Sequence, residues 1–225
     1  MLSEVPLAEA VAQLFDVPSV RVAVAPLDDP FDFAFPAEQA QVARAVTKRQ
    51  REFATGRRLA HALLDELGAA PAALLSGPDR APLWPHGIVG SICHSREWCV
   101  AALAHARDVH SLGVDHEPAT PLESRLWRRI LLPSEHAALE RLPESERGLT
   151  AKLLFSAKEC LYKAIAPQLH EFVGFLEVEL TLQPDTRRFS AVILDPARAA
   201  RLRGALQGRY LIRPEGIFTA LVLGT

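Results

Sequence analysis

The sequence predicts an α+β protein in which both halves of the chain contain helices and strands. Apolar residues recur with helical spacing over residues 37–67 and 149–166. Apolar residues alternate over 176–182, and the segments 209–213 and 217–223 flank a Pro-Glu-Gly turn, so the C-terminal part reads as antiparallel strands. Helices and strands do not follow one another in the regular alternation that a parallel α/β sheet requires.

Local signals place the remaining elements. Near the N-terminus the pattern predicts a short helix over residues 7–15 and a strand over 20–25. Within residues 37–67, Gly56 weakens the helix and suggests that it is two helices, and Gly68 is a plausible C-terminal cap. Further strands are expected at residues 88–92, 100–103, 111–117 and 189–194.

Two prolines punctuate the helical segments of the second half. Residues 121–142 are expected to be helical with a break near Pro133, where Ser134 can cap the next helix. The helix that includes residues 149–166 is expected to end at Pro167, because the residue before a proline disfavours helical geometry.

Composition limits the class of protein. The 225 residues are 49% hydrophobic and 23% charged with a net charge of −2, which suggests neither nucleic-acid nor membrane-surface binding. No apolar run approaches the ~20 residues that span a bilayer. Three cysteines form no disulfide framework, and residues 1–4 show no secretory signal, so we expect a cytoplasmic protein.

An acidic pair is the first feature of the sequence that suggests a functional site. In a strand over 111–117, Asp115 and Glu117 point to one face, while Leu112, Val114 and His116 point to the other. A hard divalent cation would relieve the repulsion between the two carboxylates. Taken alone, the pair is more typical of a solvated strand end than of a metal site.

The second such segment lies on the long helix of residues 149–166. Glu159 and Lys163 are one turn apart on one face, and an apolar stripe that includes Leu154 and Leu161 lies opposite. An ordinary exposed Glu–Lys pair would show the same spacing.

Basic and histidine-bearing segments could bind phosphate. Arg57 and His61 share a helix face, Arg80 lies in a loop, and residues 90–95 form a turn rich in small residues that contains His94. Arginine forks and backbone N–H groups are the usual phosphate partners. A solvated helix face, or a structural hydrogen bond at His94, would explain the same residues.

Cysteines and histidines in residues 93–110 raise two other possibilities, a zinc site and a nucleophilic cysteine. The set Cys93, His94, Cys99, His105 and His110 lacks the paired spacing of a zinc site. A Cys93–His nucleophilic site is also conceivable, but no third, orienting group can be chosen from the sequence.

The segments are most informative together and in this order: Ala54-Thr55-Gly56-Arg57-Arg58, Arg80-x-Pro-x-Trp84-Pro85, Gly90-Ser91-Ile92-Cys93-His94-Ser95, Gly113-Val114-Asp115-His116-Glu117 and Phe155-Ser156-Ala157-Lys158-Glu159-Cys160-Leu161-Tyr162-Lys163. Over residues 50–165 this string resembles the surfactin-type 4′-phosphopantetheinyl transferases, in particular the enterobactin synthase component D branch. The last two motifs, about forty residues apart, are the most specific.

The resemblance implies two similar α/β subdomains, 1–108 and 109–225, related by a pseudo-twofold axis with coenzyme A between them. It implies Mg²⁺ held by Asp115, Glu117 and Glu159. It implies that Glu159 and Lys163 are catalytic. Coenzyme A contacts are implied for these residues: Arg57, Arg58, Arg80, Ser91, His94, Ser95, Lys158 and Lys163. The other substrate would be a serine of an apo acyl or peptidyl carrier protein, and a monomer would suffice.

Some positions and questions stay open. His116 stands where the family more usually has an aliphatic residue, and Cys93 where it often has serine. Arg125, Arg128 and Arg129 could form a patch for an acidic carrier protein, or a solvated helix face. The rival interpretations are a Mg²⁺-dependent phosphohydrolase of a nucleotide-like substrate and a non-catalytic nucleotide-binding module. The pathway is open, with siderophore or other secondary metabolism suggested by analogy.

Overall fold

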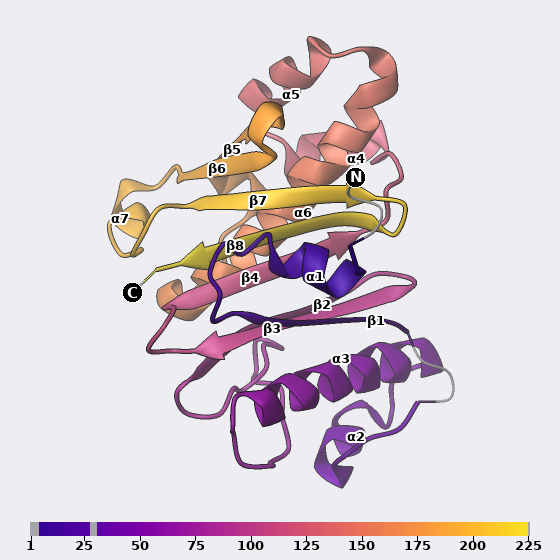
Figure 1. The fold of residues 1–225 in the computed structure, drawn as a ribbon. Coiled ribbons are helices and arrows are strands. Elements are labelled where there is room, and N and C mark those ends of the chain that lie inside the picture. Colours follow the sequence, from indigo (N-terminus) through magenta and orange to yellow (C-terminus); the bar gives the residue numbers. More distant parts are fainter. Residues whose placement is uncertain (1–4, 28–30, 225) are drawn as a thin grey trace.

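The computed structural model describes residues 5–27 and 31–224, which form two antiparallel sheets (Figure 1). The smaller sheet has the order β1-β3-β2, with β1 at Arg21–Pro26, β2 at Ile88–His94 and β3 at Trp98–His105. The larger sheet has the order β4-β8-β7-β6-β5, and its strands are Ser111–Glu117 (β4), Val178–Gln183 (β5), Arg188–Ile193 (β6), Gln207–Arg213 (β7) and Gly216–Leu223 (β8). Every strand pairing in both sheets is antiparallel, so the α+β expectation is confirmed.

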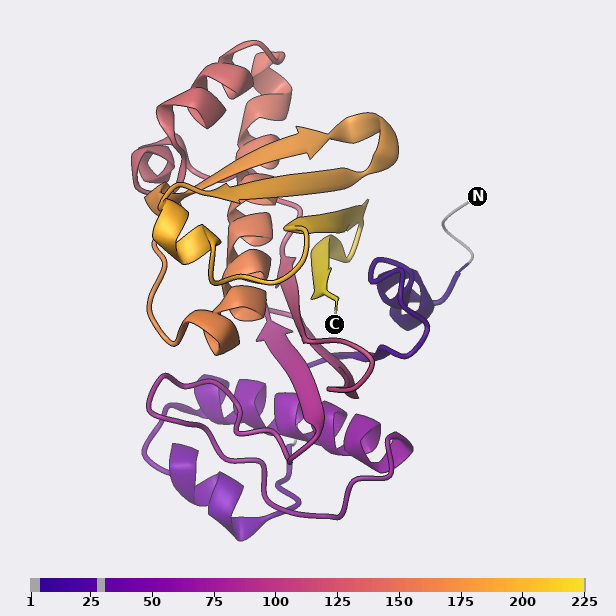
Figure 2. The ribbon, with the colours of Figure 1, turned by 90° about the vertical axis from the view of Figure 1, so that its left-hand side faces the viewer.

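Each sheet carries one long helix. Figures 1 and 2 show α3 along the smaller sheet and α6 behind the larger one, with α1 on the opposite face from α6. The helices are α1 (Leu7–Ala12), α2 (Pro36–Val42), α3 (Thr47–Glu66), α4 (Ser124–Ile130), α5 (Pro133–Glu140), α6 (Glu144–Leu169) and α7 (Pro196–Ala199), with 3₁₀ turns η1 (Phe175–Glu177) and η2 (Pro184–Thr186).

Three apolar clusters hold these layers together. One joins α6 to the larger sheet, and another joins α3 to the smaller sheet. The third is shared, because Val100 and Ala102 of β3 pack together with Val114 of β4 and Phe218 of β8 beneath α1. Burial of this shared cluster fixes the smaller sheet against the larger one. The boundary predicted between residues 108 and 109 falls between β3 and β4 and stays a prediction.

The structure corrects three details of the predicted helices. The break in the first long helical segment lies at residues 43–46 and not at Gly56, which is inside α3. Gly56 is there because α3 packs closely on β2: a Cβ at this position would lie 3.0 Å from Ile92 Cγ2. The predicted cap at Gly68 fits, since Gly68 follows α3 with a φ of 71°.

The other two corrections concern prolines. α6 does not stop before Pro167 but continues to Leu169, whose side chain is buried, and His170 ends it in the left-handed conformation. Tertiary packing of the last turn therefore outweighs the local preference. Ser134 is inside α5 and does not cap it; its hydroxyl donates to Glu179 at 2.5 Å, while Glu135 accepts from the Leu132 N–H.

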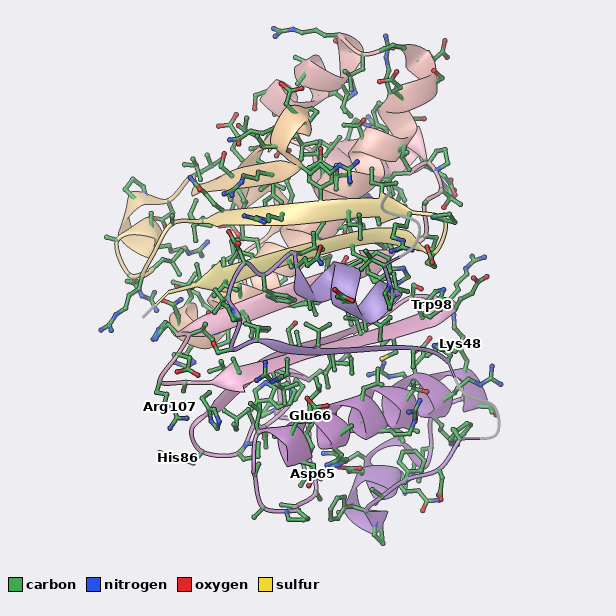
Figure 3. The ribbon with its side chains drawn as sticks, in the orientation of Figure 1. Lys48, Asp65, Glu66, His86, Trp98 and Arg107 are labelled. Carbon is green, nitrogen blue, oxygen red and sulfur yellow. The ribbon has the colours of Figure 1, made fainter. Side chains whose placement is uncertain are left out.

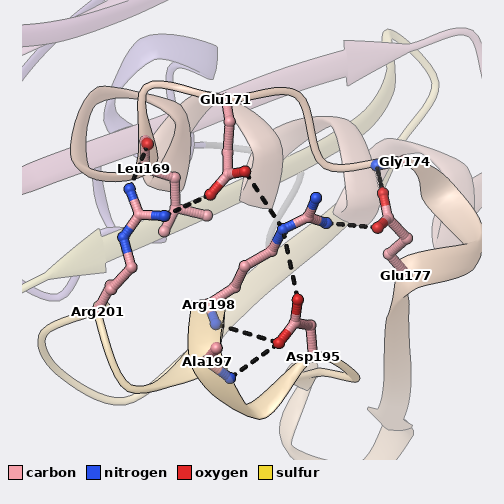
Figure 4. Close-up of polar contacts among 8 residues, drawn as sticks. All are labelled: Leu169, Glu171, Gly174, Glu177, Asp195, Ala197, Arg198 and Arg201. Carbon is pink, nitrogen blue, oxygen red and sulfur yellow. Dashed lines mark hydrogen bonds and ion pairs between the residues drawn. The ribbon is translucent and has the colours of Figure 1, made fainter.

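An ion-pair network secures the chain that follows α6 (Figure 4). Arg198 of α7 contacts Glu177 and lies 3.5 Å from Glu171 and 3.8 Å from Asp195. Arg201 donates to the Leu169 carbonyl at 2.6 Å and to Glu171. The network ties the C-terminal end of α6 to the connection between β6 and β7.

Among residues 5–27 and 31–224, no helix is long and apolar enough to cross a membrane. The absence of a leader was predicted from residues 1–4, which lie outside the described residues.

Candidate active site

The candidate site begins where β4 meets α6. Gly113 of β4 lies so close to the helix that a Cβ on it would be 2.0 Å from the Cys160 carbonyl oxygen. Two hydrogen bonds join the same elements: the Ser111 hydroxyl donates to the Ala164 carbonyl at 2.6 Å, and the Cys160 thiol to the Gly113 carbonyl at 3.3 Å. Only glycine permits this approach, and it brings the acidic strand against the helix that carries Glu159 and Lys163.

Strand alternation places the side chains of β4 as predicted. Leu112 and Val114 belong to the shared cluster with α1, on the side away from α6. Gly113, Asp115 and Glu117 therefore share the face toward α6.

Asp115 is buried and is fixed through both carboxylate oxygens. Lys163 donates to Oδ1 at 2.5 Å, and the Ser156 hydroxyl donates to Oδ2 at 2.8 Å. Ser156 also exchanges hydrogen bonds with Thr219 of β8. These contacts join the predicted Asp115 and Lys163 across β4 and α6 and leave Asp115 little rotational freedom.

Glu117 and Glu159 are less constrained. The Lys152 ammonium lies 3.1 Å from Glu117 Oε2. Glu159 is half-buried and makes no hydrogen bond or ion pair with the described residues. Glu159 is therefore the predicted site carboxylate that is available to a proton or a cation.

The charges of the three carboxylates affect one another's pKa values. Burial raises the pKa of Glu159, and the charges of Asp115 and Glu117 raise it further against the opposing effect of Lys163. Burial also raises the pKa of Glu117, and Asp115 adds to the rise. For Lys163, burial disfavours the charge, but Asp115 and Glu159 help to hold its pKa above the ordinary value. The site therefore concentrates negative charge that a cation would relieve.

As they stand, these residues are not a closed set of metal ligands. Within residues 5–27 and 31–224, no group of three or more His, Cys, Asp or Glu side chains is arranged to hold a metal ion. Asp115 and Glu117 are each turned toward a lysine. In donor chemistry the residues do fit Mg²⁺, because all three offer hard carboxylate oxygens and burial and mutual repulsion raise the pKa of Glu117 and of Glu159.

A cleft of ≈ 660 Å³ opens beside Glu117, the one of these three carboxylates that lines it. Its lining includes Lys48, Glu52, His94, Ser95, Glu117 and Lys152. Figure 3 shows Lys48 and Trp98, both in the lining, on the right-hand side of the molecule, with His86 and Arg107 on the left. The cleft thus spans the start of α3, the end of β2 and the end of β4, so both sheets contribute to it.

Two of the residues predicted to bind coenzyme A line this cleft. His94 lies 2.9 Å from the Arg49 guanidinium and 3.6 Å from Glu52. Burial lowers the pKa of His94, and Glu52 opposes this effect. Ser95 is the other, and its Oγ lies 3.4 Å from the N–H groups of Glu97 and Trp98.

Three further predicted residues have structural contacts instead. Arg57 is buried, donates to the Leu74 carbonyl at 2.6 Å and to Ser76 Oγ at 2.9 Å, and lies over the Phe53 ring; burial lowers its pKa to about 10. It therefore secures the segment after α3, and its side chain is not in the cleft lining. The Ser91 hydroxyl accepts from the Val114 N–H at 3.2 Å, linking β2 to β4.

Lys158 is the third and points away from Asp115. Its side chain is 1% exposed, and its ammonium lies 2.7 Å from Glu135 and donates to the carbonyls of Ile130, Phe175 and Val178. Burial lowers the pKa of Lys158, and Glu135 opposes the shift. With four acceptors around it, this ammonium has no free valence for a phosphate, so Lys158 packs α5 and η1 onto α6.

Arg58 and Arg80 are exposed and are not among the residues that line the cleft. Arg80 adopts the left-handed conformation with a φ of 68°, within a turn closed by its N–H to the Gly77 carbonyl. Their predicted contacts with coenzyme A stay predictions.

His116, the unusual residue of the acidic motif, has a structural explanation. Its ring packs 4.3 Å from the Phe218 ring, and Nε2 lies 3.0 Å from the Glu215 carbonyl. Burial lowers its pKa, so the neutral ring donates from Nε2 and Nδ1 is left without a partner among the described residues. Gly216, at a φ of 144°, leaves room for the ring, since a Cβ there would be 2.2 Å from Nε2.

The cysteine alternatives receive no support. Cys93, Cys99 and Cys160 are all free and buried. Burial raises the pKa of the Cys93 thiol well above its ordinary value, which disfavours the thiolate that a nucleophilic cysteine needs.

Sequence reasoning missed Lys152 and Ser156. Lys152, Ser156, Glu159 and Lys163 follow one another at intervals of four, three and four residues, so they form one stripe along α6. This spacing was a usable signal. Arg49, Lys48 and Glu52 at the start of α3 were also missed, and nothing in their local sequence distinguishes them from a solvated helix end.

Comparison with known proteins identifies the family of this chain. The family model described as the 4′-phosphopantetheinyl transferase N-terminal domain matches residues 37–104, and the one described as the 4′-phosphopantetheinyl transferase superfamily matches residues 111–213. The chain is therefore a member of the 4′-phosphopantetheinyl transferase superfamily.

Individual relatives support the same family. The chain is 41% identical over 199 residues to the 4′-phosphopantetheinyl transferase Svp of Streptomyces mobaraensis, covering 87% of this chain and 81% of that protein. It is 35% identical over 205 residues to PptT of Mycobacterium tuberculosis, covering 87% and 88%. Enterobactin synthase component D of Escherichia coli O157:H7 is 33% identical over 147 residues, covering 63% and 66%. The resemblance inferred from the motifs is confirmed.

Proposed function

We propose that this chain transfers the 4′-phosphopantetheine arm of coenzyme A to a serine of an apo acyl or peptidyl carrier protein and releases 3′,5′-ADP. Membership of the superfamily and the names of three of its relatives, all 4′-phosphopantetheinyl transferases, support the reaction. The observation that carries the proposal for these residues is the contact of β4 with α6 at Gly113, which joins Asp115 to Lys163 and sets Glu159 beside them.

We propose that Asp115, Glu117 and Glu159 hold Mg²⁺. The charges support this assignment: the three carboxylates with Lys152 and Lys163 carry a net charge of −1, and a divalent cation would change it to +1. A positive site suits a diphosphate, whereas the site without the cation would repel it. When bound, the ion would polarise the phosphate oxygens and stabilise the leaving group.

The reaction forms one bond and breaks one. The carrier's serine oxygen attacks the β-phosphorus of coenzyme A, and the bond from that phosphorus to the bridging oxygen of the leaving 3′,5′-ADP breaks. Glu159 would take the serine proton, directly or through water, because it is half-buried on a rigid helix without another partner and its raised pKa favours proton acceptance. Lys163 would neutralise charge that develops on the phosphate.

The adenosine end of coenzyme A is assigned to the cleft. His94 and Ser95 line it, and Arg49 beside His94 adds positive charge. Arg58 and Arg80 stay candidates for the 3′-phosphate. Arg57, Ser91 and Lys158 act as supports of the site, because their polar atoms are already engaged by protein groups.

Partner and location are also proposals. The carrier protein would present an acidic surface, which the exposed last turn of α4, with Arg128 and Arg129, could meet. Arg125 in the same helix already pairs with Glu123 at 2.5 Å. Three free cysteines fit a reducing cytoplasm, and siderophore or secondary-metabolite synthesis is proposed from the enterobactin relatives' names. One chain carries every proposed residue, so a monomer suffices.

Two incubations test this proposal against the phosphohydrolase and binding-module alternatives. The protein is incubated with coenzyme A and Mg²⁺, with and without an apo carrier protein, and release of 3′,5′-ADP is measured. Release that depends on the carrier supports the transferase. Release without an acceptor favours a phosphohydrolase, and no release in either incubation favours a binding module.

The variant Glu159→Gln tests the role of the proposed base. We expect coenzyme A binding, measured by calorimetry, to change little, while single-turnover transfer falls by about 10²–10⁴-fold. A variant that binds coenzyme A poorly but transfers normally once saturated would show that Glu159 binds substrate and does not act as the base.

A further inference from the structure

Lys152 is a cation placed directly on a proposed metal ligand. Its ammonium lies 3.1 Å from Glu117 Oε2, and the two side chains are only 14% and 22% exposed. Both line the cleft. Lys152 and Glu117 thus form a partly buried ion pair that faces the cleft. Solvent screens the attraction between their charges less here than at an open surface.

The rest of the residue is held as well. The ammonium lies 5.8 Å from the centre of the Phe155 ring, at a cation–π distance, and Phe155 in turn packs edge-on against Phe175 at 5.6 Å. Lys152 also belongs to the α6 stripe with Ser156, Glu159 and Lys163. Its placement is therefore fixed by the same helix that fixes the site.

The two lysines of the stripe divide the two carboxylates of β4 between them. Lys163 pairs with the buried Asp115, and Lys152 pairs with the less buried Glu117. A carboxylate oxygen bonded to an ammonium cannot at the same time give that lone pair to a cation. Both carboxylates of β4 are thus paired with an ammonium group, and the described acidic residues do not form a ready set of metal ligands.

We propose that Lys152 is a positioning residue that occupies Glu117 in place of the divalent cation and must release it before the cation binds. The inference rests on the metal assignment made above for Asp115, Glu117 and Glu159. It predicts that Lys152 weakens cation binding by the free protein, first by competing for Glu117 and second by placing a positive charge beside the ion.

Direct binding of Mn²⁺, followed by electron paramagnetic resonance of the free ion without coenzyme A, tests this idea. Lys152→Met keeps an unbranched apolar side chain of similar length but removes the charge, and we expect it to tighten binding about two- to fivefold, as for loss of a partly exposed charge pair. Lys152→Arg keeps the charge and should bind Mn²⁺ like the wild type. Lys48→Met is the matched control, because Lys48 lines the same cleft but lies 3.8 Å from Glu52, which is not a proposed ligand.

A second change separates competition from a general charge effect. In a protein that already carries Glu117→Gln, adding Lys152→Met should tighten Mn²⁺ binding less than the same substitution does in the wild type. Thermal unfolding of each variant, measured in parallel, confirms that the folded protein is compared.

The possible results lead to different conclusions. Equal or weaker Mn²⁺ binding by Lys152→Met, with a wild type that does bind, overturns the role of Lys152 and leaves the metal site standing. Mn²⁺ binding by neither protein overturns both, while carrier modification still tests the transferase reaction separately. Binding by the Met variant alone is the strongest support.

Discussion

The contact at Gly113 makes a quantitative prediction for Gly113→Ala. The new Cβ would lie 2.0 Å from the Cys160 carbonyl oxygen and 3.1 Å from the Ala164 backbone nitrogen. Non-bonded carbon and oxygen atoms do not approach closer than about 3 Å, so the strand and the helix must separate by about 1 Å. Overpacking of this kind costs about 1–3 kcal/mol or more.

The same displacement of β4 from α6 also disturbs the candidate active site. Two residues further along β4, Asp115 is held to Lys163 at 2.5 Å and to Ser156 at 2.8 Å, and a shift of about 1 Å stretches both contacts. Misplacement by that amount can slow a reaction about 10²-fold. We therefore expect Gly113→Ala to lose transfer activity by about two orders of magnitude even under conditions in which it stays folded.

Urea unfolding and single-turnover transfer measure the two effects. Gly224→Ala is the matched control, because a Cβ at Gly224 would have no atom within 4 Å. If Gly113→Ala unfolds at the wild-type urea midpoint and transfers at the wild-type rate, the idea that this contact sets the geometry of the site is wrong.

Two further predictions concern buried charge. Lys158→Met should cost about 3–5 kcal/mol in urea unfolding, because it leaves Glu135 buried without its cation, and adding Glu135→Gln should restore part of the loss; a cost below about 1 kcal/mol would contradict the assigned role. Glu159→Gln should stabilise the protein at neutral pH. Burial raises the pKa of Glu159 in the folded state. Its carboxylate therefore destabilises the fold increasingly as the pH rises from the ordinary glutamate pKa through the higher folded value. Below both pKa values the side chain is protonated in the folded and unfolded states, and this effect on stability is absent. Thermal unfolding of variant and wild type from pH 4 to 8 should diverge with rising pH, and a constant difference would argue against this cause.

The sequence allowed much of the fold to be predicted because its signals were local. The alternation in residues 111–117 placed Asp115 and Glu117 on one face of a real strand, and the stripe around Glu159 belongs to a real helix. The wrong details, such as the helix end at Pro167, arose where tertiary burial outweighed the preference of a single residue.

The candidate site was less completely predictable. Period-2 and period-3.6 patterns show which face a side chain occupies but not which partner it meets. Arg57 and Lys158 belong to motifs that suggest ligand contacts, yet buried acceptors from distant segments engage them: Leu74 O and Ser76 for the first, Glu135 for the second. Lys152 lies on the predicted helix face, but only the three-dimensional structure shows that the Glu117 side chain lies next to it.

The most direct test of the account is intact-mass measurement of an apo carrier protein after incubation with the enzyme, coenzyme A and Mg²⁺. We expect wild type and Glu144→Gln, an exposed acid at the start of α6, to add one phosphopantetheinyl group, and Asp115→Asn and Glu159→Gln to add almost none in the same time. Unmodified carrier with the wild type, or full modification by Asp115→Asn and Glu159→Gln, would contradict the assignment of the chemistry to the meeting of β4 and α6.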